Sequence, residues 1–178
     1  KIFIAPGNAG TSLEPKAENV DISASDIDAL VSFAEKENID LVIVGPEDPL
    51  VNGITDAFKK VGINCFGPEL LGAQLEGSKD FAKSFMKKHN IPTASYQSFT
   101  DADQAKNYIQ ENELPLVIKA DGLAAGKGVV IAENYETAKR TIDEFISETK
   151  YGEASKKIII EEFLIGQELS YIVMVDGT

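Results

Sequence analysis

The chain has 178 residues, 43% hydrophobic and 26% charged, which is typical of a globular protein able to bury a sizeable core. Its net charge of −12 argues against nucleic acid or an anionic membrane as the main partner, because both are negatively charged. One cysteine, Cys65, excludes an internal disulfide framework and favours a cytoplasmic location, and no apolar run approaches the ~20 residues that span a bilayer.

Short apolar segments alternate with amphipathic helices over the first part of the chain. We expect strands at residues 2–5, 41–44 and 63–66, and helices at 25–37 and 53–61. Ser25 is a candidate cap for the first helix. Strands joined by helices imply a parallel sheet with right-handed crossovers. Residues 1–75 are therefore predicted to form an incomplete, doubly wound α/β domain that lacks the usual first strand and its glycine loop.

A helical stretch follows and then a smaller unit. Residues 69–90 have helical periodicity, with Gly77 expected to break the helix and Ser78 to cap its second part. The later pattern predicts strands at 94–99, 116–119, 129–132 and 157–163, and helices at 101–112 and 135–149. We expect a connecting helical segment at 76–93, an α+β subdomain at 94–165, and the start of a further subdomain at 166–178. Residues 173–178 have the pattern of a strand reaching a turn.

A glycine-rich loop joins two strand-like segments in this second unit. It runs from Lys119 to Gly128 with the sequence K-A-D-G-L-A-A-G-K-G. Glycines let backbone N–H groups approach an anion closely, and lysines add positive charge. The loop is not a Walker A motif, because Lys127 is followed by Gly128 and then by a strand. The pattern favours a flap that folds over a polyphosphate, with a simple hairpin turn as the alternative.

Two further segments suit a nucleotide. Lys79 stands near a helix start, where a lysine is usually a solvated charge but could also neutralise phosphate. Residues 158–168 form an apolar strand that ends in carboxylates. Glu161 could accept a hydrogen bond from the exocyclic amine of adenine, and Glu168 could accept from ribose hydroxyls. Solvent-facing carboxylates are the alternative interpretation of this segment.

This order of parts resembles the ATP-grasp superfamily and, within it, the glycinamide ribonucleotide synthetase family. The resemblance rests on P-G-N-A-G-T at 6–11, G-P-E-D-P-L at 45–50, F-G-P at 66–68, L-E-G-S-K at 75–79, the loop at 119–128 and E-E-F-L at 161–164. It implies a partial doubly wound domain followed by an ATP-grasp lid. It also implies nucleotide contacts for Lys79, Lys119, Asp121, Gly122, Leu123, Ala124, Ala125, Gly126, Lys127, Gly128, Glu161, Glu162, Phe163, Leu164 and Glu168.

The loops that follow the first two expected strands would face the second substrate. In doubly wound folds, ligands bind at the carboxyl edge of the sheet. The resemblance places a sugar phosphate at this edge, near Asn8, Gly10, Thr11 and Glu47. Ordinary turn chemistry at a strand end is the alternative for these residues.

The resemblance implies an activity and its small-molecule partners. Members of the family join glycine to 5-phosphoribosylamine with ATP and Mg²⁺ (or Mn²⁺), through glycyl phosphate, in purine biosynthesis. We assign no catalytic nucleophile, because such chemistry needs positioning and charge neutralisation. The magnesium carboxylates are expected beyond Thr178, so residues 1–178 alone are predicted to be inactive. The alternatives are another ATP-grasp carboxylate–amine ligase and a nucleotide-binding module without turnover.

Overall fold

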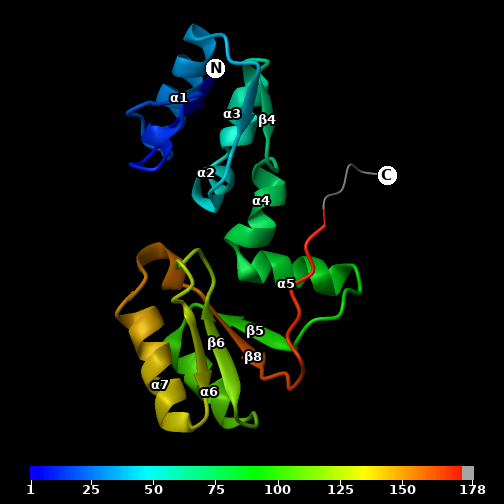
Figure 1. The fold of residues 1–178 in the computed structure, drawn as a ribbon. Helices are drawn as coiled ribbons and strands as arrows, with labels where there is room; N and C mark the ends of the chain where they lie inside the picture. The colour runs from blue at the N-terminus through cyan, green and yellow to red at the C-terminus, as the bar shows by residue number, and fades with distance from the viewer. Residues whose placement is uncertain (174–178) are drawn as a thin grey trace.

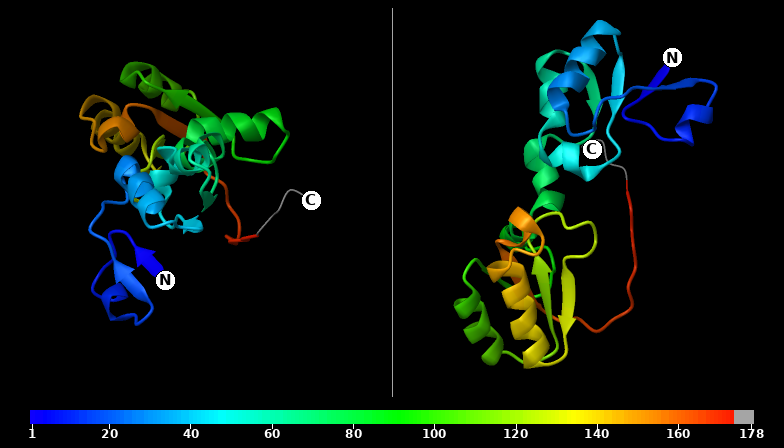
Figure 2. Two further views of the ribbon diagram at one scale, coloured as in Figure 1. Left: turned by 90° about the horizontal axis from the view of Figure 1, so that it is seen from above. Right: turned by 90° about the vertical axis from the view of Figure 1, so that its left-hand side faces the viewer.

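The computed structural model describes residues 1–173, so nearly all of the strand and turn expected at 173–178 lies outside the described residues. The first part of the chain forms one group of elements and the second part another, with two helices between them (Figures 1 and 2). In chain order, the strands and α-helices are β1 (Ile2–Ile4), β2 (Ala17–Asn19), α1 (Ile27–Lys36), β3 (Leu41–Ile43), α2 (Glu47–Val51), α3 (Ile54–Lys60), β4 (Asn64–Phe66), α4 (Leu70–Gly77), α5 (Lys79–Lys88), β5 (Tyr96–Phe99), α6 (Ala102–Gln110), β6 (Leu116–Ala120), β7 (Val129–Ala132), α7 (Tyr135–Ile142) and β8 (Ile158–Glu162).

The strands of the first part are parallel, as expected, but they form two pairs. β1 pairs with β2, and β3 pairs with β4. The pairing of β1 with the short strand β2 was not predicted. In the described part of the chain β1 is not hydrogen-bonded to β3, and apolar residues of both strands, including Phe3, Ile4 and Val42, line a cavity of about 370 Å³. The expected single parallel sheet is therefore divided in this structure.

Helices of the first part pack on β3 and β4 through a small core. Ala34 of α1 and Ile54 and Phe58 of α3 are buried there. The helix α1 is capped by Asp26, whose carboxylate accepts a hydrogen bond from the Ala29 amide at 3.1 Å. The prediction that Ser25 would cap this helix is wrong, because the chain enters the helix one residue later and Asp26 occupies the cap position.

The helical stretch at 69–90 is broken where the sequence predicted. α4 ends at Gly77, and Ser78 caps α5 by accepting a hydrogen bond from the Phe81 amide at 3.1 Å. Gly77 also allows close packing, since a Cβ there would lie 2.7 Å from Cγ1 of Val51 in α2. The break turns the chain from the first group of elements towards the second (Figure 1).

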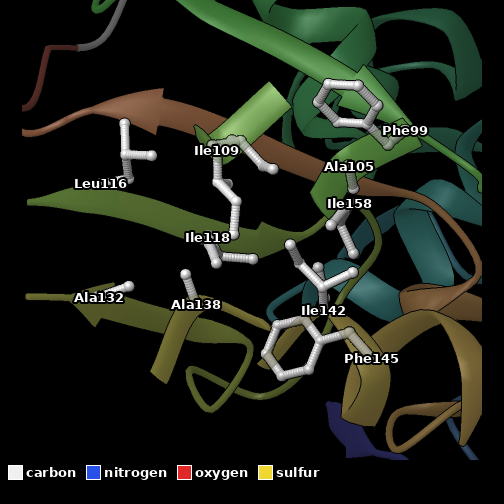
Figure 3. Close-up of a cluster of buried hydrophobic side chains, with 12 residues drawn as sticks. Phe99, Ala105, Ile109, Leu116, Ile118, Ala132, Ala138, Ile142, Phe145 and Ile158 are labelled. Atoms are coloured by element: carbon white, nitrogen blue, oxygen red, sulfur yellow. The ribbon is translucent and has the colours of Figure 1, made fainter. Parts of the chain in front are cut away.

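The second part is built on a four-stranded antiparallel sheet with the order β5-β8-β6-β7. Along β6 fully buried and half-buried residues alternate, as expected for a strand whose two faces differ. Leu116 and Ile118 point towards the face that α6 and α7 cover, where they join a buried cluster with Ile142 and Phe145 (Figure 3). Ala120 belongs to the same cluster. The opposite face carries α5, as the contacts described below show.

The end of α7 departs from a regular helix. The expected helix at 135–149 is capped by Asn134, which accepts from the Thr137 amide at 2.8 Å. From Asp143 to Ser147 the chain forms a π-helical turn, in which the Glu148 amide donates to the Asp143 carbonyl. None of the helices in residues 1–173 has the length and apolar character needed to cross a membrane.

The buried cluster of the second part is expected to set its stability. Ile118 is fully buried, so Ile118→Ala in the full-length protein should lower the free energy of unfolding by about 2–5 kcal/mol, through lost burial and the cavity left behind. Urea denaturation followed by circular dichroism would measure this change. Leu13→Ala, at a side chain that is 82% exposed, should change the stability by less than about 0.5 kcal/mol. Equal effects of the two substitutions would contradict this assignment of the core.

Candidate nucleotide-binding site

The sheet register places Lys119 and Glu161 on the same face. Lys119 of β6 lies opposite Ile159 of β8, and Val117 lies opposite Glu161. Residues directly opposite each other share a face, and the face alternates along each strand. Lys119 and Glu161 are therefore diagonal neighbours on the face away from α6 and α7. Their side chains meet, with Lys119 Nζ 3.0 Å from Glu161 Oε2.

The Glu161 carboxylate is shared by two lysines. Lys83 Nζ also lies 3.0 Å from Oε2, and the exposed fraction of the Glu161 side chain is 5%. The second oxygen, Oε1, is buried without a hydrogen-bond partner among the described residues. A buried acceptor without a donor is costly, and such groups are rare in folded proteins. The orphaned oxygen is therefore a candidate acceptor for a ligand's donor, which would reach it only after a neighbouring side chain moves, since the atom is covered in this structure.

Lys79 stands at the start of α5, beside the glycine-rich loop. Its ammonium donates to the Gly122 carbonyl at 3.2 Å and to the Asp121 carbonyl at 3.4 Å. The Asp121 carboxylate accepts from the Asp80 amide at 2.7 Å and from the Ser78 hydroxyl. The first residues of the loop thus hold the N-terminus of α5, where the helix dipole favours negative charge.

The electrostatics of Lys79 suit an anion. Burial lowers the pKa of its ammonium below the ordinary value, the carboxylate of Asp121 works in the opposite direction, and the nearby charge of Lys119 lowers it further. A phosphate group between these two lysines would relieve their repulsion and favour the charged form of Lys79. The charges of the two lysines that the sequence predicted as phosphate contacts therefore influence each other.

The flap, residues 121–128, has the backbone of a tight hairpin turn. The Lys127 amide donates to the Ala124 carbonyl at 2.9 Å, and the two residues between them, Ala125 and Gly126, have positive φ values of 48° and 75°. Two successive residues of this kind define a type I′ turn, which matches the twist of antiparallel strands. The tip of the flap is exposed, as is the side chain of Lys127.

The base of the flap is closely packed. A Cβ on Gly122 would lie 2.9 Å from Cα and Cβ of Ala154, and a Cβ on Gly128 would lie 2.7 Å from the Cβ of Ala124. The Gly122 amide also donates to the Ala154 carbonyl at 3.0 Å. Close approach therefore accounts for glycine at both ends of the flap, while its tip projects from a fixed base.

The segment after β8 contains the other predicted nucleotide contacts. The Glu162 carboxylate accepts from the Ser95 amide at 2.9 Å, and the Glu162 amide donates to the Ser95 carbonyl. Phe163 is 38% exposed and Leu164 is 64% exposed, and Glu168 is exposed as well. The structure places Glu161 on the same face as Lys119, whereas the Glu162 side chain, opposite Leu116, lies on the other face, and Glu168 has no side-chain hydrogen bond among the described residues. Its ribose contact stays a prediction.

Apolar side chains lie next to the charged cluster on the open face of the sheet. Val129 of β7 is opposite Lys119, and Ile131 is opposite Val117. Both β7 residues are about half exposed, at 47% and 51%. An aromatic base placed on this surface would bury apolar area beside the Glu161 carboxylate. The sequence analysis did not identify these two residues, although the period-two pattern of β7 could have placed them on the same face as Lys119.

The predicted sugar-phosphate residues form a compact loop after β1. The Asn8 side chain accepts from the amides of Gly10 and Thr11, and the Thr11 hydroxyl bonds to the Asn19 side chain at 2.7 Å. Glu47 is exposed in the first turn of α2. These contacts match the turn chemistry that was the alternative interpretation, and a substrate role for these four residues stays a prediction. Residues 1–173 contain no cluster of three or more metal-ligating side chains.

Polar residues that the sequence analysis did not single out support the site. Asp80 accepts from the Ser98 hydroxyl and pairs with Lys157 at 3.0 Å. Burial raises the pKa of Asp80, but these two hydrogen bonds outweigh it and hold the pKa below the ordinary value. Lys83 is another polar residue that the sequence analysis did not identify. On a helix with exposed lysines at 87 and 88, no sequence signal distinguished a buried lysine.

Comparisons with solved structures identify the class of fold. The chain resembles the biotin carboxylase domain of Hydrogenobacter thermophilus 2-oxoglutarate carboxylase with a TM-score of 0.71 and 20% identity, over 86% of this chain and 36% of that one. It resembles D-alanine–D-alanine ligase from Bacillus anthracis with a TM-score of 0.65 and 17% identity, over 85% and 48%. These similarities show the fold. The class follows from a family model, since residues 77–178 match an ATP-grasp domain.

Matches to family models identify the family to which the chain belongs. Residues 1–76 match the N domain of phosphoribosylglycinamide synthetase, and residues 77–178 match its ATP-grasp (A) domain. The chain therefore belongs to the phosphoribosylglycinamide synthetase family. It is 55% identical over 177 residues to phosphoribosylamine–glycine ligase of Haemophilus influenzae and 54% identical over 176 residues to that of Escherichia coli O157:H7.

The same family is found among solved structures. Phosphoribosylamine–glycine ligase from Thermotoga maritima is 32% identical with a TM-score of 0.67, over 91% of this chain and 37% of that one. The two curated relatives align with 99% of this chain, which spans 41% of their length. The family is thus shown for the whole chain, and the activity of the complete protein is treated below as a proposal.

Lys119 is expected to contribute directly to nucleotide affinity. Lys119→Ala in the full-length protein should weaken ATP binding by about 1.5–3 kcal/mol, as for a lost hydrogen bond to a charged group. Isothermal titration calorimetry measures the change. Lys139→Ala, at an exposed lysine of α7, is the matched control and should leave the affinity unchanged. A folded Lys119→Ala protein with wild-type affinity would exclude the contact.

The flap is expected to open readily without nucleotide. Its exposed tip, residues 125–127, is held by one turn hydrogen bond and by the Tyr151 hydroxyl, which donates to the Lys127 carbonyl at 2.8 Å. Amide hydrogen exchange of the full-length protein, followed by mass spectrometry, should be fast there and slower with ATP. The amides of β6 should be protected in both states. The same protection of the tip with and without ATP would contradict closure of the flap.

Proposed function

We propose that the complete protein joins glycine to 5-phosphoribosylamine, with conversion of ATP to ADP and phosphate, in purine biosynthesis. Membership of the phosphoribosylglycinamide synthetase family and 55% identity to a phosphoribosylamine–glycine ligase support this activity. ATP, glycine and phosphoribosylamine are the proposed small-molecule partners. The single cysteine is consistent with the proposed location in the cytoplasm.

The observation that carries the nucleotide assignment is the unpaired Glu161 Oε1 beside two lysines. Adenine presents an exocyclic amine, which is the type of donor that this buried oxygen lacks. Lys119, bound to the same carboxylate, lies next to the flap, and Lys79 faces the flap from α5. The residues present therefore fit an adenine nucleotide whose base lies near Glu161 and whose phosphates lie beneath the flap.

Each predicted contact has a distinct task in this arrangement. Lys79 and Lys119 would neutralise the phosphates from two sides, and the backbone amides of the flap would donate to phosphate oxygens. The backbone at Glu162 and Leu164 would bind the edge of the base, and Glu168 would accept from the ribose hydroxyls. The remaining predicted contacts, Phe163 and the flap residues Leu123 to Gly128, would exclude water from the nucleotide.

The proposed reaction has two steps. The carboxylate of glycine attacks the γ-phosphoryl group of ATP, which yields glycyl phosphate and ADP. The amine of phosphoribosylamine then attacks the acyl carbon, and phosphate leaves as the amide forms. Neither step needs a covalent nucleophile of the protein, so charge neutralisation and alignment are the main contributions of the residues.

A divalent cation would neutralise charge between the β- and γ-phosphates of the nucleotide. The biotin carboxylase domain cited above is described with magnesium ADP. The described residues of the present chain bring no cluster of carboxylates together for a metal, so we derive no step through it. Asn8, Gly10, Thr11 and Glu47 are the residues that we propose near the sugar phosphate.

Product analysis tests this function. The full-length protein is incubated with ATP, magnesium, glycine and freshly prepared phosphoribosylamine, and the products are identified by mass spectrometry. We expect glycinamide ribonucleotide, ADP and phosphate in equal amounts, with no phosphate release when glycine is omitted. An amide formed with another amino acid in preference to glycine would favour a different ATP-grasp ligase, and ATP binding without any product would favour a binding module.

A further inference from the structure

The buried lysine of α5 stands out because it does not take part in the proposed nucleotide contacts. The side chain of Lys83 is 8% exposed. Its ammonium donates to the Thr93 hydroxyl at 2.8 Å and to the Ala94 carbonyl at 3.2 Å, and pairs with Glu161 Oε2 at 3.0 Å. An ammonium has three donors, and three acceptors surround this one. Lys83 is therefore held in a fixed position by groups of the protein.

Lys119 differs from Lys83 in this respect. It contacts the same oxygen of Glu161, but its side chain is 27% exposed and this is the one side-chain hydrogen bond found for it in the described structure. A lysine held by a single pair can move towards a phosphate, whereas one held by three acceptors in a buried site will stay. The Glu161 carboxylate is thus shared by one lysine that is fixed by three acceptors and one that is held by a single ion pair.

We propose that Lys83 is a positioning residue that serves as the permanent counter-ion of Glu161. Because Lys83 keeps the carboxylate paired, Lys119 can leave Glu161 and bind the triphosphate. The second oxygen of the carboxylate then accepts a hydrogen bond from the amine of the base. The inference rests on the proposed function, because it assumes an adenine nucleotide in the site. Both lysines bind Oε2, which leaves Oε1 as the acceptor. Lys83 thereby contributes to selection of a 6-aminopurine without touching it.

The physical reason is the cost of a buried, unpaired charge. If Lys83 were absent, transfer of Lys119 to phosphate would leave a carboxylate that is 5% exposed without a counter-ion. Lys119 would then remain with Glu161, and the orientation of Oε1 would no longer be fixed. Both the phosphate contact and the recognition of the amine would weaken. A merely structural lysine, in contrast, would affect the packing of α5 and not the choice of base.

Calorimetry on the full-length protein tests this role with two ligands, ATP and purine riboside triphosphate, which lacks the 6-amine. The wild type should prefer ATP by about tenfold or more, as expected for a hydrogen bond to a charged group. Lys83→Met should lower this preference severalfold. Lys87→Met, at an exposed lysine one turn further along α5, is the matched control and should retain it.

A double-mutant cycle separates the positioning role from a structural one. Glu161→Gln removes the charge that needs a counter-ion, so adding Lys83→Met to it should produce no further loss of preference. Equal effects of Lys83→Met in both backgrounds would overturn the proposal. So would an unchanged preference in Glu161→Gln, a result that can be obtained even if Lys83→Met does not fold. Failure of the wild-type protein to bind ATP would instead contradict the proposed function.

Discussion

The antiparallel pairing of β6 with β8 is the constraint on which the candidate site depends. The two strands lie about forty residues apart in the chain, and their register brings Lys119 and Glu161 to one face. A shift of that register by one residue would move Glu161 to the face covered by α6 and α7. The buried cluster on that face resists such a shift, because Ile158 and Ile160 of β8 would leave it. The register of β6 and β8 therefore determines both the packing of the core and the geometry of the site.

The helix α5 is tied to this sheet by polar contacts at its first turns. Asp121, directly after β6, accepts from the Asp80 amide, and Asp80 in turn bonds to Ser98 and Lys157. Lys79 cannot move far from the flap while these contacts persist. The contacts therefore join the helix to the base of the flap, and the exposed tip is where we expect movement. Such a division suits a site that must admit a nucleotide and then cover it.

Much of the second part could be predicted from sequence, because its signals are local. Short apolar, β-branched segments identified β6 and β7, and Ser78 marked the start of α5. Other features depend on tertiary contacts. The strand β2 has the sequence Ala-Glu-Asn, which carries no strand pattern, and it exists through its pairing with β1. The sequence indicated Lys119 and Glu161 as separate contacts, but their pairing and the burial of Lys83 depend on how α5 packs on the sheet.

The charge balance around the site explains how an acidic protein can hold a polyanion. Lys79, Lys83, Lys119 and Lys157 lie close to Asp80, Asp121 and Glu161, and the charge of Glu76 also acts on Lys79, so cations and carboxylates are about balanced here in a chain whose net charge is −12. Two carboxylates are occupied locally, Asp121 by the amide of α5 and Asp80 by Lys157 and Ser98. The carbonyls that hold Lys79 are weak competitors for a phosphate. Binding of a polyphosphate therefore requires no additional cations, since Lys79 and Lys119 exchange their protein acceptors for phosphate oxygens.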